Sequence, residues 1–221
     1  MNTIDTVLFD FDGTVMDTND LIYNSWQYTY RTVTGEEGDP EFIYSTYGEI
    51  LQSSMAKAFP NIDVDKTVSI YREYQKDNYA KQIRLFPKIK ETIAAIKQQG
   101  YKQALVTSRL REKTMEGVTL FGIDRYFDTI VTMEDTKAHK PNPDPILKAL
   151  ERLDSKGDQA IMVGDSQYDL LCAHNAGVEY AMVAWTKAGE AVKKQGLKPD
   201  YVMKEAADIL DILARRENGR H

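Results

Sequence analysis

The sequence has little of what defines several large classes of protein. Its one cysteine, Cys172, can form no disulfide within the chain and leaves a cysteine-based zinc site without ligands. No apolar run approaches the roughly 20 residues that cross a bilayer. The N-terminus carries Asp5, Asp10 and Asp12 in place of the basic and apolar stretches of a signal peptide. These absences exclude a disulfide scaffold and predict a cytoplasmic protein with no membrane partner.

Positive charge is also scarce. The chain has 28 basic and 34 acidic residues, which gives a formal net charge of −6. A nucleic-acid interface needs clustered positive charge, so we expect no nucleic-acid partner. The 221 residues are 42% hydrophobic and 28% charged, which is ordinary for a folded protein and excludes a wholly disordered chain. This length suits one large domain or one domain with an insertion, and we take a monomer as the default.

Short β-branched segments alternate with helical periodicities through most of the chain. Ile89, Ile93 and Ile96 lie four and three residues apart, as on the apolar face of one helix. The segments that predict buried parallel strands are 3–9, 103–106, 160–163, 180–183 and, more weakly, 130–131. Strands that alternate with helices predict an α/β fold, a Rossmann-like, doubly wound parallel sheet with helices on both faces.

Residues 18–82 interrupt this alternation. They contain helical stripes, such as Ile22, Trp26 and Tyr30, but no convincing buried strand. We therefore predict an all-helical cap domain over residues 18–82, inserted into a core domain of residues 1–17 and 83–221. The aromatic residues concentrated in the insertion favour packing over a stacking platform.

Acidic, basic and hydroxyl side chains follow the predicted strands. Asp-Phe-Asp-Gly-Thr at 10–14 comes after the first strand, and Thr107 and Ser108 come after the second. Gly-Asp-Ser-Gln-Tyr-Asp at 164–169 follows a third strand, and Lys140 lies in a proline-rich loop. In open α/β sheets, ligands bind beyond the carboxyl ends of the strands. Four carboxylates so close together would repel one another without a cation, and oxygen ligands without His or Cys favour Mg²⁺.

These motifs, in this order, resemble those of the haloacid dehalogenase-like hydrolase superfamily. They are Asp-x-Asp-Gly-Thr at 10–14, a strand-terminal Thr107, Lys140 in Lys-Pro-x-Pro, and the Gly-Asp motif at 164–169. The resemblance covers essentially the whole chain, and the helical insertion is similar to the C1 cap of that family. Segments 2–9, 17–22 and 184–189 resemble the phosphoglycolate phosphatase and PpaX-type pyrophosphatase branch.

The resemblance implies a role for each motif residue. Asp10 would attack phosphorus and form an aspartyl-phosphate. Asp12 would protonate the leaving oxygen and then take a proton from the attacking water. Lys140 and Thr107, assisted by Ser108, would hold the remaining phosphate oxygens. The implied ligands of Mg²⁺ are the Asp10 carboxylate, the Asp12 backbone carbonyl, Asp165, and Asp169 either directly or through water.

The function implied is a Mg²⁺-dependent phosphatase acting on a small phosphorylated metabolite, such as phosphoglycolate, or on pyrophosphate. A phosphomutase of the β-phosphoglucomutase type is the alternative, but such mutases usually carry Gly-Val where this chain has Gly13-Thr14. A haloacid dehalogenase would lack the second aspartate. The substrate would be read by the cap loop around Gly48, because glycine permits close backbone approach and its neighbours Tyr47 and Glu49 offer polar contacts to the substrate. Arg109 and Arg111 either meet an anionic substrate or begin a surface helix.

Overall fold

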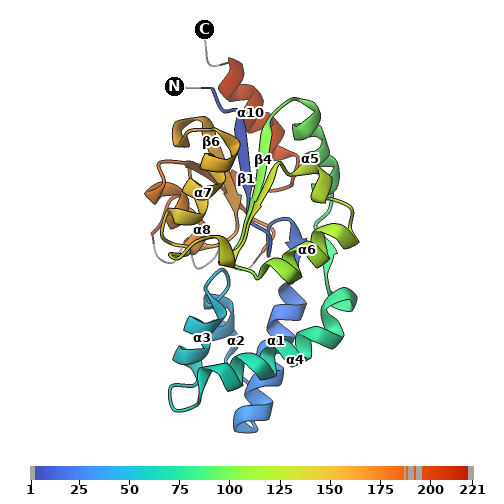
Figure 1. The fold of residues 1–221 in the computed structure, drawn as a ribbon, viewed down its shortest axis with the longest axis vertical. Helices are drawn as coiled ribbons and strands as arrows, with labels where there is room; N and C mark the ends of the chain where they lie inside the picture. The colour runs from blue at the N-terminus through green and yellow to red at the C-terminus, as the bar shows by residue number, and fades with distance from the viewer. Residues whose placement is uncertain (1–2, 187, 189–191, 193–195, 219–221) are drawn as a thin grey trace.

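A parallel sheet of six strands forms the centre of the described part of the chain, which comprises residues 3–186, 188, 192 and 196–218 of a computed structural model (Figure 1). The strand order is β5-β4-β1-β6-β7-β8. The strands are β1 (Thr6–Phe9), β4 (Lys102–Val106), β5 (Thr129–Val131), β6 (Ala160–Gly164), β7 (Glu179–Val183) and β8 (Tyr201–Met203). Because β1 lies between β4 and β6, the strand order reverses at the centre of the sheet, where α/β folds bind their ligands.

Helices cover both faces of this sheet. Side chains of β1 alternate between the faces: Val7 and Phe9 join one apolar cluster and Leu8 joins the other. The first cluster includes residues of α5 (Ile89–Gln98), α6 (Arg111–Leu120) and α10 (Asp208–Asn218). The second includes residues of α7 (Asp144–Leu153) and α8 (Gln167–Asn175). This arrangement confirms the doubly wound α/β fold.

Two details of the sheet differ from the sequence prediction. The first strand begins at Thr6 rather than at residue 3, although Asp5 still bonds to both neighbours through Gln159 O and Lys102 N, each at 2.9 Å. The short strand β8 was not predicted, because three residues are too few to show a β pattern. Short 3-10 helices occupy Asp124–Tyr126, Met133–Asp135 and Gly157–Gln159.

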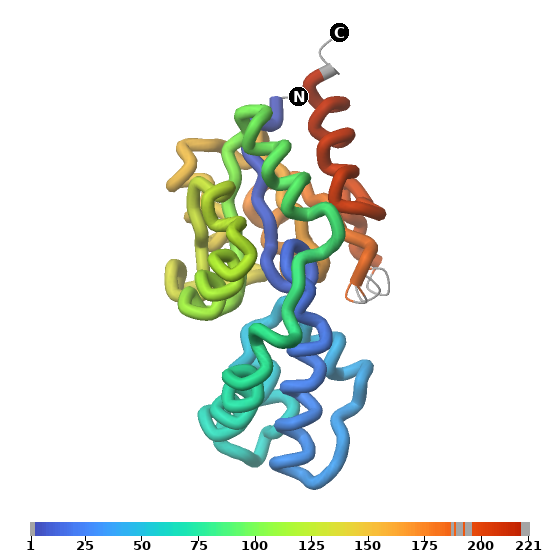
Figure 2. Tube along the Cα trace, turned by 90° about the vertical axis from the view of Figure 1, so that its right-hand side faces the viewer, coloured from blue at the N-terminus to red at the C-terminus, as the bar shows by residue number. Residues whose placement is uncertain are grey.

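Four helices form a separate layer at the carboxyl ends of the strands, and we call them the cap helices (Figures 1 and 2). They are α1 (Asn19–Thr34), α2 (Pro40–Ser45), α3 (Leu51–Ala58) and α4 (Val64–Gln82). Trp26 lies in an apolar cluster that cap residues form together with Ala188, and its ring is edge-on to Phe42 and to Tyr71 at centroid distances of 6.1 and 6.0 Å. These aromatic residues are therefore packing residues.

The chain enters and leaves the cap helices through a two-stranded antiparallel ribbon. It pairs β2 (Met16–Asp17) with β3 (Arg84–Leu85). We retain as a proposal the division into a core of 1–17 and 83–221 and a cap of 18–82, whose boundaries lie next to this ribbon. Among the helices described, none combines the length and the apolar character that crossing a membrane requires.

Candidate active site

The carboxyl ends of three adjacent strands bring the motif residues together. Asp10 follows β1, Thr107 follows β4 and Asp165 follows β6. Backbone bonds continue each ladder by one residue: Asp10 N donates to Val163 O and Thr107 N donates to Val131 O, both at 2.9 Å. All three side chains are buried. Because the backbone is fixed up to these positions, their side chains start from a rigid platform.

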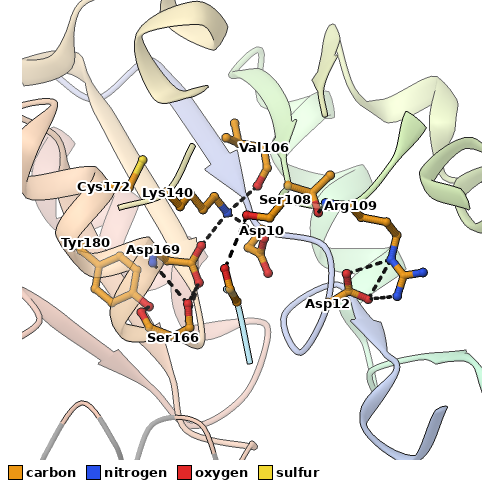
Figure 3. A network of polar contacts seen from close by, with 12 residues as sticks. Asp10, Asp12, Val106, Ser108, Arg109, Lys140, Ser166, Asp169, Cys172 and Tyr180 are labelled. Carbon is orange, nitrogen blue, oxygen red and sulfur yellow. Dashed lines mark hydrogen bonds and ion pairs between the residues drawn. The ribbon is translucent and has the colours of Figure 1, made fainter. Parts of the chain in front are cut away.

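Lys140 lies at the centre of this group (Figure 3). Its Nζ donates to Asp10 Oδ1 at 2.8 Å, to Asp169 Oδ1 at 2.5 Å and to Val106 O at 2.7 Å. These three hydrogen bonds use all three N–H donors of the ammonium group. Lys140 is itself buried. It therefore neutralises two buried carboxylates and ties β1, β4 and α8 together.

Asp10, Asp165 and Asp169 form a cluster that could hold a metal ion. One carboxylate oxygen of each lies within 4.8 Å of the others. Asp169 is oriented by Ser166, whose hydroxyl donates to Asp169 Oδ2 at 2.6 Å in a capping box at the start of α8. Thr186 orients Asp165 by donating to its Oδ2 at 3.0 Å. Gly13 allows Asp165 this position, since a Cβ there would lie 2.1 Å from Asp165 Oδ2.

The electrostatics of this cluster favour a divalent cation. Burial, together with the charge of Asp169, raises the pKa of Asp10 to about 7, although Lys140 opposes the shift. Burial and the neighbouring Asp169 also raise the pKa of Asp165. Burial acts to lower the pKa of Lys140, but Asp10 and Asp169 raise it above its usual range. Three carboxylates and one ammonium leave two excess negative charges when ionised, so the hard oxygen donors fit Mg²⁺.

Asp12 points away from this cluster and is held by a separate set of contacts. Thr18 Oγ1 donates to Asp12 Oδ1 at 2.7 Å. Arg109 donates through Nε to Oδ2 at 2.9 Å and through Nη2 to Oδ1 at 2.7 Å. Arg109 is thus an active-site residue, whereas Arg111 begins α6 at the surface and pairs with Asp135. The two arginines that the sequence could not separate therefore have different environments.

The cap helices reach the site through the loop around Gly48. Ser108 Oγ contacts Gly48 O at 3.5 Å, and a Cβ on Gly48 would lie 2.5 Å from Ser166 Oγ. Gly48 has a φ of +83°, so glycine serves both the turn and the close approach. Tyr47 lies beside it, but its hydroxyl donates to Asn19 O at 3.1 Å. That hydroxyl therefore already has a partner in α1. The predicted contact of Tyr47 with substrate stays a prediction.

A cavity of about 280 Å³ separates the cap helices from the strand ends. Glu49 lines it, but its carboxylate accepts from Ser54 Oγ at 2.7 Å and pairs with Lys57. Its charge therefore does not repel an anion as a free carboxylate would. The predicted site residues that line the cavity are Asp10, Asp12, Tyr47, Gly48, Thr107 and Ser108.

Sequence reasoning missed the residues that orient the carboxylates. Ser166 carries a recognisable signal, because Ser-x-x-Asp is a capping-box pattern. Thr18 and Thr186 carry none, since each contact depends on how two segments meet in space. Of the segments that resemble the phosphoglycolate phosphatase branch, residues 2, 187 and 189 lie outside the described residues.

The sheet, the cap helices and the acidic site between them define a capped α/β protein of Rossmann-like fold. A family model for haloacid dehalogenase-like hydrolases matches residues 7–183. The chain therefore belongs to the haloacid dehalogenase-like hydrolase family, as its motifs indicated.

The similarities lie with phosphatases of that family. The chain is 38% identical to pyrophosphatase PpaX of Halalkalibacterium halodurans, over 95% of this chain and 97% of that protein. It is 36% identical to pyrophosphatase PpaX of Bacillus cereus, over 96% and 97%. Among solved structures, a haloacid dehalogenase-like family protein from Streptococcus pneumoniae has a TM-score of 0.84 at 26% identity, covering 96% of this chain and 99% of its own. A predicted phosphoglycolate phosphatase from Haemophilus somnus has a TM-score of 0.82 at 26% identity, with the same coverage.

Proposed function

We propose that this haloacid dehalogenase-like phosphatase releases phosphate from a small phosphorylated metabolite or from pyrophosphate, through an aspartyl-phosphate on Asp10 and with Mg²⁺ bound. The observation that carries the proposal is the convergence of Asp10, Lys140, Asp165 and Asp169 in one buried cluster, with Asp12 held apart beside the cavity.

Asp10 suits the role of nucleophile. Lys140 occupies its Oδ1, while its Oδ2 has no hydrogen-bond partner among the described residues. In the proposed step, that free oxygen forms a bond to phosphorus as the bond to the leaving oxygen breaks. The fixed side chain would hold the attacking oxygen in line with the leaving group, which saves the entropy of bringing them together.

Asp12 suits the role of general acid and base. Its carboxylate lines the same cavity as Asp10 but points toward Arg109 and Thr18. There it would give a proton to the leaving oxygen and later take one from the water that cleaves the aspartyl-phosphate.

Asp10, Asp165 and Asp169 would hold Mg²⁺, and the Asp12 backbone carbonyl remains a proposed ligand. When bound, the ion supplies positive charge that offsets the approach of an anionic nucleophile to an anionic phosphoryl group. Since the three donors of Lys140 are already in use, we propose that Lys140 keeps Asp10 and Asp169 in place. The Thr107 hydroxyl accepts from Arg109 N at 3.1 Å and keeps its hydrogen for a phosphate oxygen, whereas Ser108 Oγ would exchange its 3.5 Å contact with Gly48 O for one.

Substrate size follows from the cavity. Its volume of about 280 Å³ lies just below the roughly 300–1,000 Å³ typical of small-molecule sites. That space suits pyrophosphate, the substrate in the names of the PpaX relatives, or a compound the size of phosphoglycolate.

Phosphate release from pyrophosphate, phosphoglycolate, sugar phosphates and nucleotides tests the proposal, with NMR of the products to distinguish hydrolysis from isomerisation. Asp10→Asn should lower kcat at least 1,000-fold, about 4 kcal/mol of barrier, because an amide is not a nucleophile. Asp20→Asn, an exposed residue of α1, is the matched control. Activity of Asp10→Asn within tenfold of the wild type would refute the covalent mechanism, and a rearranged phosphate ester as product would favour the phosphomutase.

A further inference from the structure

Arg109 is a largely buried cation with a rigid position in the active site. Its side chain is 10% exposed and pairs with Asp12. Its guanidinium carbon lies 5.9 Å from the centroid of the Phe11 ring and 5.4 Å from that of Tyr79. Two aromatic rings and a carboxylate therefore fix the plane of the guanidinium.

One edge of this guanidinium has no partner within the described part of the chain. The hydrogen bonds to Asp12 use Nε and Nη2, and no described residue accepts a bond from Nη1. Figure 3 shows one guanidinium nitrogen outside the pair with Asp12. A guanidinium has five N–H donors in a planar fork. The edge formed by Nη1 and the second N–H of Nη2 therefore remains available for a bidentate contact with a carboxylate or phosphoryl group.

The other cations that line the cavity or the cluster are either paired with carboxylates or exposed. Lys140 pairs with Asp10 and Asp169. Lys113 pairs with Glu116 at 2.7 Å. Arg72 also lines the cavity, but it is exposed. Of the described residues that line the cavity, Arg109 is thus the largely buried cation with donors to spare.

The position of Arg109 matches the place of the leaving group. Asp10, Asp12 and Arg109 line one cavity. If Asp10 attacks phosphorus and Asp12 protonates the leaving oxygen, the leaving group extends past Asp12 to Arg109. We propose that Arg109 determines specificity by binding a second anionic group, a carboxylate or a phosphoryl group carried by the leaving group. This inference rests on the proposed function.

The inference defines a substrate class. The preferred compound is a phosphate ester or anhydride whose leaving group bears its own negative charge within a few atoms of the scissile bond. An ester of similar size with a neutral leaving group lacks the contact with Arg109. Because a charged hydrogen bond inside a water-poor site is stronger than one at the surface, the preference is large enough to measure as a ratio of kcat/KM values.

The test compares two esters of matched size, phosphoglycolate and 2-hydroxyethyl phosphate. The first carries a carboxylate where the second carries a neutral hydroxymethyl group. Arg109→Gln should lower the ratio of their kcat/KM values at least 20-fold, and Arg109→Lys, which keeps the charge without the fork, should lower it less. Arg111→Gln, two residues away and outside the cavity, should leave the ratio within threefold of wild type. Binding of methylenediphosphonate, measured by calorimetry, should weaken at least tenfold in Arg109→Gln, while inorganic phosphate binds within threefold of wild type.

Two results would overturn the inference. If Arg109→Gln lowers kcat/KM equally for both esters, Arg109 acts only by positioning Asp12. If it changes neither the ratio nor methylenediphosphonate binding, Arg109 contacts no anion. Should the glutamine variant fail to fold, the lysine variant and its binding data decide. Failure of the wild type to release phosphate from any substrate would refute the proposed function, and the binding measurement would still decide the role of Arg109.

Discussion

Removing Lys140 should destabilise the protein more than any surface lysine would. Its ammonium is buried and neutralises Asp10 and Asp169, while also bonding Val106 O. Breaking a buried ion pair by deleting one partner typically costs about 3–5 kcal/mol, because the remaining charge loses its compensation. Here two carboxylates lose their partner at once. We therefore expect Lys140→Met to lower the free energy of unfolding by about 3–5 kcal/mol at pH 8.

The same argument predicts a pH dependence. Burial raises the pKa of Asp10 to about 7 even with Lys140 present. A carboxylate with a raised pKa binds its proton more tightly in the folded state than in the unfolded state. Its ionisation therefore reduces stability as the pH rises from about 4 through the folded-state value. Without Lys140 this shift is larger, so the variant should lose most stability at pH 8 and at least half of that loss should disappear at pH 5.

Urea denaturation in EDTA at both pH values measures these differences. Lys148→Met is the matched control, because Lys148 pairs with Glu151 on the exposed side of α7, at 2.7 Å. Exposed pairs of this kind contribute at most about 1 kcal/mol. A loss below about 1 kcal/mol for Lys140→Met at pH 8, or an equal loss at pH 5, would refute the electrostatic reasoning.

Three further predictions test other parts of the structure. Mg²⁺ at about 100 times its Kd should add about 2.7 kcal/mol to the free energy of unfolding of the wild type. Asp165→Asn should remove this gain and the control Glu151→Gln should keep it. No gain in the wild type would contradict the metal site. Gly48→Ala should lower kcat/KM at least tenfold for every substrate, because its Cβ would lie 2.5 Å from Ser166 Oγ. Gly35→Ala is the control for backbone strain, since Gly35 has a similar φ of +79° and its Cβ would meet nothing within 4 Å. Equal effects of the two variants would argue against the clash as the cause. Asp135→Asn should lower the free energy of unfolding by about 1–2 kcal/mol at pH 7, because hydrogen bonds from Thr132 and Arg152 lower the pKa of Asp135 to about 2 despite partial burial. This stability is present above about pH 4 and is lost as the pH falls toward 2. An equal loss at pH 7 and pH 2 in urea melts would exclude the ionised Asp135 carboxylate as its source.

The sequence was sufficient for five of the six strands of the sheet and for the residues at their carboxyl ends, for one physical reason. Parallel strands share a carboxyl edge, so residues that follow different strands meet without any knowledge of side-chain contacts. Asp10, Thr107 and Asp165 were placed in this way. Helical periodicity was equally informative, since Ile89, Ile93 and Ile96 are all buried on one face of α5.

The contacts that orient these residues could not be predicted. Arg109 and Asp12 are 97 positions apart, and their ion pair depends on how the loop after β4 meets the turn after β1. Nothing in the residues next to Arg109 separates it from Arg111, although the Arg109 side chain is 10% exposed and that of Arg111 is 45% exposed. Local patterns determine where an element begins and which face is apolar, whereas the partner of a buried charge is a property of the assembled fold.

The ribbon of β2 and β3 also has a mechanical consequence. The chain crosses between the sheet and the cap helices twice, and both crossings are paired, Met16 with Leu85 and Asp17 with Arg84. Because the two crossings are hydrogen-bonded to each other, a displacement of one is transmitted to the other. Its strands lie about 4.8 Å apart, which sets the distance between the two ends of the insertion. Any helical assembly whose ends meet at that spacing could be grafted there without changing the register of the sheet.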